Sequence, residues 1–91
     1  MNEERGNVWQ GVGIITGASS GIGDAIVRKL ASNATGLIIG ARRKSALEAL
    51  ASELGDHIVP VECDVRKRED VQQLADIAMD RFGHIDAIVN N

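Results

Sequence analysis

The fold of this chain is decided by residues 12–23, which read VGIITGASSGIG. A short apolar segment runs into a glycine-rich turn, and the turn leads into a helical pattern. A strand, a glycine-rich turn and a helix in this order bring backbone N–H groups up to a phosphate. The stretch therefore predicts a strand at Val12–Thr16, a helix at Gly21–Asn33 and a phosphate-binding turn between them.

The residues of the turn have separate physical roles. Gly17 permits a tight turn out of the strand. Gly21 lets the backbone approach a pyrophosphate without a Cβ in the way, and Gly23 lets the helix pack closely on the sheet. Ser19 and Ser20 add hydroxyl donors near the phosphates, and the N-terminus of the helix contributes about half a positive charge.

Two other interpretations of the turn need to be weighed. A P-loop requires a Lys-Ser or Lys-Thr pair after its last glycine, but Asp24 and Ala25 follow Gly23, which excludes it. A glycine-rich turn that binds no ligand is the remaining alternative. The strand before the turn and the helix after it argue against that alternative.

The rest of the chain alternates helical and strand patterns. The predicted elements after the first helix are strands at 36–41, 58–63 and 85–89 and helices at 45–54 and 67–82. Ser45 and Glu48 match a capping box at the start of the second helix. The alternation predicts a Rossmann-like α/β fold, a doubly wound parallel sheet of pattern β-α-β-α-β-α-β in strand order 3-2-1-4, truncated after strand 4. In this order the turn and Asn90-Asn91 arrive at the same end of the sheet.

Helical spacing also predicts which side chains face the core. The predicted inward residues are Ile22, Ile26 and Leu30 in the first helix, Leu47, Leu50, Ala51 and Leu54 in the second, and Val71, Leu74, Ala78 and Phe82 in the third. Because Trp9 and Phe82 are the only aromatic residues, the core is expected to consist of Ile, Leu, Val and Ala.

Length and composition limit the chain to one small domain. Its 91 residues are predicted to divide into a flexible tail at 1–10 and a Rossmann half-domain at 11–91. The hydrophobic share of 44% is too high for a disordered chain, and the net charge of −3 argues against a nucleic-acid partner. The tail has no signal-peptide core, and no apolar run reaches membrane-spanning length. With a single cysteine, Cys63, these features predict a cytoplasmic protein that binds no membrane.

A basic triplet follows the second predicted strand, where residues 40–44 read GARRK. NAD-binding units usually carry an acidic residue about 20 residues after the glycines. Cations just before a helix are locally unfavourable, and a 2′-phosphate would supply the missing anion. The triplet therefore predicts NADP(H) in preference to NAD(H), with Arg42 as the main contact and Arg43 as the second. The alternative is a solvated basic loop. The second basic cluster, 66–68, is interpreted as a solvated helix start.

These motifs, with Cys63-Asp64-Val65 and the closing stretch 85–91, IDAIVNN, resemble the short-chain dehydrogenase/reductase family over nearly the whole chain after the tail. The resemblance implies that Asp64 hydrogen-bonds the adenine amino group, with the backbone of Val65 beside it, and that Asn91 lies against the adenosine half. The other asparagine would tie the central strands together, and Asp86 would be structural. The turn, the basic triplet and the resemblance together predict eleven cofactor-binding residues: Gly17, Ser19, Ser20, Gly21, Ile22, Gly23, Arg42, Arg43, Asp64, Val65 and Asn91. Read without it, Asp64 is a strand-end polar residue or helix cap, and the asparagines form a turn.

The catalytic part of the family pattern is absent from these residues. The family uses a Tyr-x-x-x-Lys pair, a serine and a further asparagine, and this chain has no tyrosine. No catalytic residue is assigned. His57 and His84 are predicted to be surface residues, and no cluster has metal-ligand spacing. The resemblance implies that the full-length protein is a homo-oligomeric, NADP(H)-dependent oxidoreductase that transfers hydride between NADPH and a carbonyl or secondary alcohol. A non-catalytic dinucleotide-binding module and an inactive fragment are the alternatives.

Overall fold

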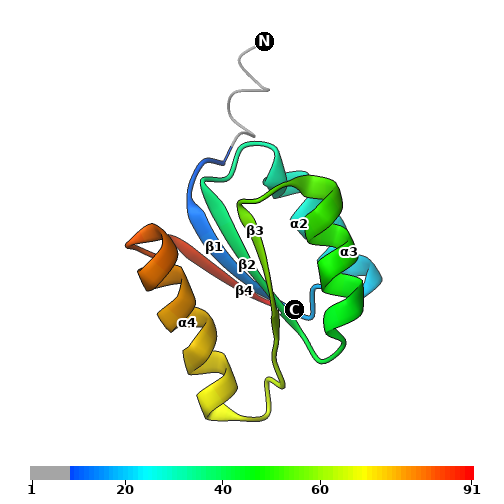
Figure 1. Cartoon of the computed structure of the whole chain (residues 1–91), viewed down its shortest axis with the longest axis vertical. Helices are drawn as coiled ribbons and strands as arrows, with labels where there is room; N and C mark the ends of the chain where they lie inside the picture. The colour runs from blue at the N-terminus through cyan, green and yellow to red at the C-terminus, as the bar shows by residue number, and fades with distance from the viewer. Residues whose placement is uncertain (1–8) are drawn as a thin grey trace.

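The computed structural model describes residues 9–91 (Figure 1). Most of the predicted tail, residues 1–8, lies outside the described residues. The elements in chain order are β1 Val12–Thr16, α2 Gly21–Ala31, β2 Gly36–Ala41, α3 Lys44–Leu54, β3 Ile58–Glu62, α4 Arg68–Phe82 and β4 Ala87–Asn90. All seven predicted elements are present, with ends that differ by at most one or two residues.

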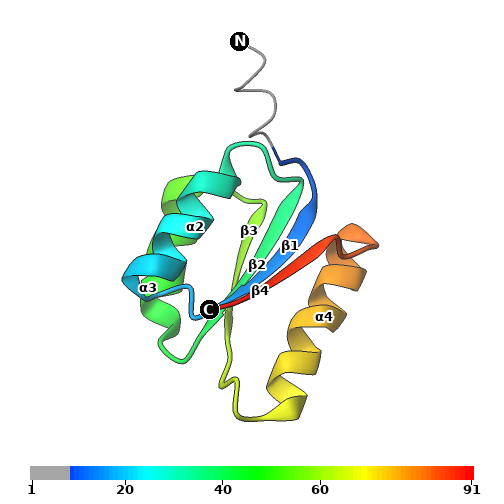
Figure 2. The same cartoon turned by 180° about the vertical axis from the view of Figure 1, so that it is seen from behind.

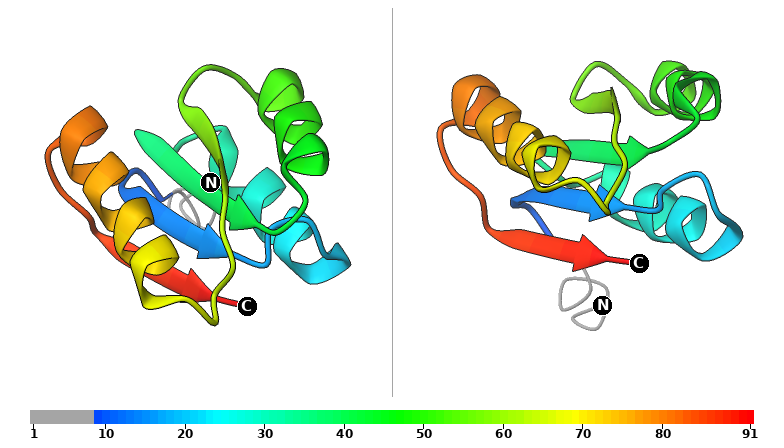
Figure 3. Two further views of the ribbon diagram at one scale, coloured as in Figure 1. Left: turned by 60° about the horizontal axis from the view of Figure 1, so that its bottom comes forward. Right: turned by 90° about the horizontal axis from the view of Figure 1, so that it is seen from below.

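The four strands form one parallel sheet in the order β3-β2-β1-β4, which confirms the predicted order 3-2-1-4. Helices α2 and α3 cover one face of the sheet and α4 covers the other (Figures 2 and 3). The chain is therefore a Rossmann-like α/β domain. Because Thr16 pairs with Asn90, the carboxyl ends of β1 and β4 lie side by side, next to the glycine turn.

The core lies in two layers, one on each face of the sheet. Ile15, Leu37 and Ile39 point toward α2 and α3, where they meet residues such as Val27 and Leu47. The alternate strand residues Val12, Ile14 and Ile38 point toward α4 and contact Leu74 and Ala78. Strand β2 is buried along its whole length because both of its faces are covered. Each fully buried aliphatic side chain contributes about 1.5–3 kcal/mol to folding.

The prediction of a capping box at Ser45 and Glu48 is wrong. Helix α3 begins one residue earlier, at Lys44, with Arg43 as an N-cap that makes no side-chain capping bond. Ser45 is therefore already inside the first turn of the helix. Glu48 lies 3.9 Å from the Lys44 ammonium instead, as an exposed i,i+4 pair.

The predicted inward face of α2 is shifted by one residue. Its buried residues are Gly23, Val27 and Ala31, whereas Ile22 is 69% exposed. The shift has a steric cause: a Cβ on Gly23 would overlap the carbonyl oxygen of Gly17, so only glycine can face the turn there. Ile26 and Leu30 pack at the edge of the core.

Near β4 one further expectation is corrected and another is met. Val71 was predicted to face the core, but it is 41% exposed and lines an open groove with Ile14 and Ile88. Asp86 has the expected structural role: its Oδ2 accepts from the Val12 amide at 2.8 Å and lies 3.0 Å from His84 Nε2. Asp86 is able to remain half exposed because its partners lie at the amino ends of the strands.

Candidate functional site

The glycine turn joins the end of β1 to the start of α2, and hydrogen bonds of its own residues shape it. Gly17 has a φ of +65°, a backbone conformation that favours glycine. The Ser20 hydroxyl donates to the Gly17 carbonyl at 2.8 Å and accepts from the Gly23 amide at 3.3 Å, so Ser20 caps the helix. The first-turn N–H groups of α2 therefore face the carboxyl end of the sheet. That is the arrangement in which helix N-termini bind anions.

The end of β4 holds the turn from the other side. The Thr16 hydroxyl donates to Asn90 Oδ1 at 2.8 Å, which joins β1 to β4. Asn91 Nδ2 donates to the Gly17 carbonyl at 3.2 Å and to the Ser20 hydroxyl at 2.8 Å. The Ser20 hydroxyl thus has three partners within the protein, and its proton already goes to Gly17.

One cavity of about 380 Å³ lies beside the turn, at the carboxyl ends of the strands. It is lined by Gly17, Ser19, Ala41, Arg42, Arg43, Cys63, Asp64, Val65, Arg66 and Asn91. The structure therefore brings seven of the eleven predicted site residues to one cavity. The other four lie at the start of α2, where Ser20, Gly21 and Ile22 are exposed and Gly23 is buried.

Two cations form one wall of this cavity. Arg42 and Arg43 follow β2, and both side chains are exposed. Among residues 9–91, neither guanidinium forms an ion pair with a carboxylate within 4.0 Å. The first turn of α3, which follows them, contains no acidic residue. The wall therefore presents positive charge that the neighbouring helix does not neutralise.

Asp64 also lines this cavity, with its side chain only 16% exposed. The Arg66 side chain and then the Arg66 backbone N–H hold the pKa of this carboxyl well below its usual range, with a smaller effect from Arg42. The Asp64 carboxylate is therefore ionised, and it is an acceptor of hydrogen bonds only.

Sequence reasoning missed the functional position of Arg66 and of Asp70. Arg66 was interpreted as part of a solvated helix start, but α4 begins at Arg68 and Arg66 lines the cavity. Asp70, in the first turn of α4, accepts from the Asp64 amide at 3.0 Å. One signal was available: an Asp side chain often binds the N–H two residues on, which pairs Asp64 with Arg66.

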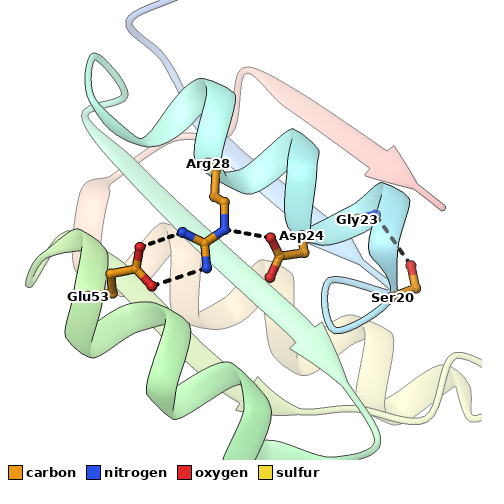
Figure 4. A network of polar contacts seen from close by, with 5 residues as sticks. All are labelled: Ser20, Gly23, Asp24, Arg28 and Glu53. Carbon is orange, nitrogen blue, oxygen red and sulfur yellow. Dashed lines mark hydrogen bonds and ion pairs between the residues drawn. The ribbon is translucent and has the colours of Figure 1, made fainter.

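A second polar network joins α2 to α3 behind the turn (Figure 4). Arg28 donates to Asp24 at 2.6 Å and forms a two-pronged contact with Glu53 on α3. The hydrogen bond from Arg28 is the main cause that lowers the pKa of Glu53. Because all three side chains are exposed, this network orients the two helices and contributes little to stability.

Other chemistry is not prominent in the part of the chain that the structure describes. Residues 9–91 contain no group of three His, Cys, Asp or Glu side chains that could hold a metal ion. Burial raises the pKa of the Cys63 thiol, which disfavours its reactive thiolate form. None of the helices in residues 9–91 combines the length and apolarity needed to cross a membrane.

The fold and the turn define a Rossmann-like domain, and comparison with known proteins identifies its family. The family model for short chain dehydrogenases matches residues 12–91, so the chain belongs to this family of oxidoreductases. An uncharacterized oxidoreductase of Staphylococcus saprophyticus is 42% identical over 86 residues, which cover 93% of this chain and 35% of that protein.

Two solved structures show the same likeness. An alcohol dehydrogenase from the archaeon Thermococcus sibiricus, complexed with 5-hydroxy-NADP, is 39% identical with a TM-score of 0.78, covering 88% of this chain and 36% of its own. A 3-ketoacyl-(acyl-carrier-protein) reductase from Brucella melitensis, complexed with NADH, is 35% identical with a TM-score of 0.76. The match covers 85% of this chain and 32% of the reductase chain. The chain thus spans about a third of the length of these relatives.

Proposed function

We propose that the chain is the cofactor-binding part of an NADP(H)-dependent short-chain oxidoreductase, which transfers hydride between NADPH and a carbonyl or secondary alcohol. The observation that carries the proposal is the cavity beside the glycine turn, with Arg42 and Arg43 in its wall. Solved relatives complexed with NADH and with 5-hydroxy-NADP support a nicotinamide dinucleotide as the cofactor.

The start of α2 fits a pyrophosphate group. Gly21 has no heavy atom within 4 Å of the position its Cβ would take, so phosphate oxygens have room to approach the backbone. We assign this contact to the exposed residues Ser19, Gly21 and Ile22. Gly17, Ser20 and Gly23 serve it by holding the turn in shape.

The adenosine half is assigned to the cavity. Arg42 and Arg43 hold the 2′-phosphate, because an arginine fork binds a phosphate through two parallel hydrogen bonds. An unfavourable set of cations at the start of α3 supports NADP(H) over NAD(H), since a bound phosphate would neutralise it. Asp64 and the backbone of Val65 contact the adenine, and Asn91 lies beside the adenosine. Domain 11–91 is therefore a cofactor-binding half-domain.

The reacting groups come from outside these residues. Bound NADPH supplies the hydride, and the family's tyrosine acid/base has no counterpart in a chain without tyrosine. The second candidate function is a non-catalytic dinucleotide-binding module, which would bind the cofactor at the same cavity. Steady turnover of NADPH by the 91-residue chain would contradict both the location of the reacting groups outside these residues and the non-catalytic module. For the full-length protein we propose a small carbonyl or alcohol substrate, a homo-oligomer and a cytoplasmic location, to which the buried free Cys63 is suited.

Titration of the chain with NADPH and NADH tests the cofactor assignment. Arg42→Ala is expected to weaken NADPH by about 10- to 100-fold, as for the loss of a hydrogen bond between charged groups. NADH binding should change much less, because NADH has no 2′-phosphate. Arg68→Ala is the matched control, since Arg68 is also basic but does not line the cavity.

Equal losses of NADPH and NADH affinity in Arg42→Ala would refute the 2′-phosphate role. Failure of the folded wild-type chain to bind either dinucleotide would refute cofactor binding altogether. Circular dichroism on each variant separates loss of binding from loss of fold.

A further inference from the structure

The loop that carries Asp64 is held by backbone hydrogen bonds on both sides. The Asp64 amide donates to Asp70 Oδ2 at 3.0 Å, and the Asp64 carbonyl accepts from the Lys67 amide at 2.9 Å. Asp64 also follows the buried Cys63, whose amide donates to the Ala41 carbonyl at 2.9 Å. With its backbone anchored in this way, Asp64 keeps one important freedom, the rotation of its carboxylate.

Arg66 removes that freedom. Its backbone N–H and its Nε both donate to Asp64 Oδ1 at 3.0 Å, and its Nη2 donates to Oδ2 at 2.8 Å. Each carboxylate oxygen accepts about two hydrogen bonds. Oδ1 is therefore filled by Arg66, whereas Oδ2 keeps one acceptor position.

That acceptor position belongs to a cavity-lining residue. Asp64 and Arg66 both line the 380 Å³ cavity with Arg42 and Arg43. In a cavity with three guanidinium groups, Asp64 is the one carboxylate among the lining residues. Its Oδ2 is thus a single fixed acceptor that a ligand with one N–H donor could use.

We infer that Arg66 is a positioning residue for base selection: it orients the Asp64 carboxylate so that Oδ2 accepts one hydrogen bond from an exocyclic amino group of the purine. This inference rests on the proposed function. A 6-amino purine satisfies Oδ2. A 6-oxo purine places an acceptor against an acceptor and leaves both without a partner, which a site built for a donor rejects.

The test compares NADPH with its hypoxanthine analogue, which differs by an oxo group in place of the adenine amino group. The wild-type chain is expected to prefer NADPH by about tenfold, at the lower end for a hydrogen bond to a charged group because the cavity is open to solvent. Arg66→Ala should reduce this preference several-fold. Arg66→Lys should restore part of it, because an ammonium binds the carboxylate without the two-pronged geometry.

A double-mutant cycle separates positioning from a simple charge effect. Asp64→Ala should lose the preference, since it removes the acceptor, and adding Arg66→Ala to it should then change nothing. Arg68→Ala should leave the preference intact. Arg66 is 74% exposed, so its variants are expected to stay folded. Circular dichroism checks each variant, the Asp64 variants included.

Three results would overturn the inference while leaving the proposed function standing. The first is a wild-type chain that binds NADPH and its hypoxanthine analogue equally. The second is an Arg66→Ala variant in which both affinities fall to the same extent. The third is an Arg66→Ala variant that changes the ratio of NADPH affinity to NADH affinity and leaves the base preference as it was. The last would make Arg66 a phosphate ligand. A chain that binds no dinucleotide of either base defeats the proposed function itself.

Discussion

The two faces of the sheet differ most at β4, where neighbouring residues have opposite surroundings. Val89 packs against the core layer beneath α2 and α3. Ile88, on the α4 side, is 63% exposed. An apolar groove of about 370 Å³ lies there, lined by Ile14, Thr16, Arg68, Val71, Gln72, Ala75 and Ile88.

The difference shows how far one helix reaches across a sheet. Helix α4 buries Ile14 and Ile38 on the two central strands but leaves Ile88 on the outer strand β4 exposed. On the opposite face two helices extend the cover as far as Val89. Stability is therefore concentrated in β1 and β2, and β4 is held mainly by its pairing with β1 and by polar contacts at its ends.

The largest expected effect tests the doubly covered centre. Ile39→Ala, at a side chain with no exposed surface, should lower the free energy of unfolding by about 2–5 kcal/mol. The matched control is Ile88→Ala, which should change it by less than about 0.5 kcal/mol because the side chain is already exposed. Denaturant titration at low protein concentration measures both. Similar losses in the two variants would break the comparison.

A smaller effect is expected on association. β4 lies at the edge of the sheet with Ile88 exposed, and such an edge favours pairing with another copy of the chain. The 91-residue chain should self-associate, and Ile88→Lys should weaken the association roughly tenfold or more. Sedimentation velocity over a range of concentrations measures it. A monomeric wild-type chain with a sharp cooperative melt would count against this expectation.

The smallest expected effect concerns the covered face. Arg28→Met removes the exposed link between α2 and α3 and keeps the aliphatic part of the side chain (Figure 4). The unfolding midpoint should fall only slightly, and the difference from wild type should vanish in high salt. Lys29→Met, on the same helix, is the control. If Arg28→Met lowered the free energy of unfolding as much as Ile39→Ala, ion pairs and not buried contacts would be the main stabilising interactions on the α2 and α3 side of the sheet.

Local patterns were sufficient to predict the elements and their order. The apolar strand at Val12–Thr16 and the alternation after it lead to the order β3-β2-β1-β4, since right-handed crossovers leave few choices. Gly17 could be placed at the turn because its positive φ is a demand of the backbone itself. Spacing alone misplaced Ile22, because the inward face of α2 is set by the close contact of Gly23 with Gly17 and Ala18 in the turn.

The site residues divide in the same way. Arg42 and Arg43 could be proposed from their position after a strand, because the carboxyl ends of parallel strands meet at one edge. Asp64 could be proposed from the family resemblance. Their partners could not. Asn91 donates to the Ser20 hydroxyl across 71 residues of sequence, and neither the glycine turn nor the end of β4 predicts that hydrogen bond by itself.

The sequence by itself determined the fold type, the turn and the cluster of cations beside it, because these depend on backbone sterics and on periodicity over a few residues. The tertiary structure alone decided that Thr16 binds Asn90, that Asn91 binds the Ser20 hydroxyl and that Asp86 binds the Val12 amide. Hydrogen bonds of side chains are directional and short, so their partners are known only when the strand ends and loops have been brought together in space.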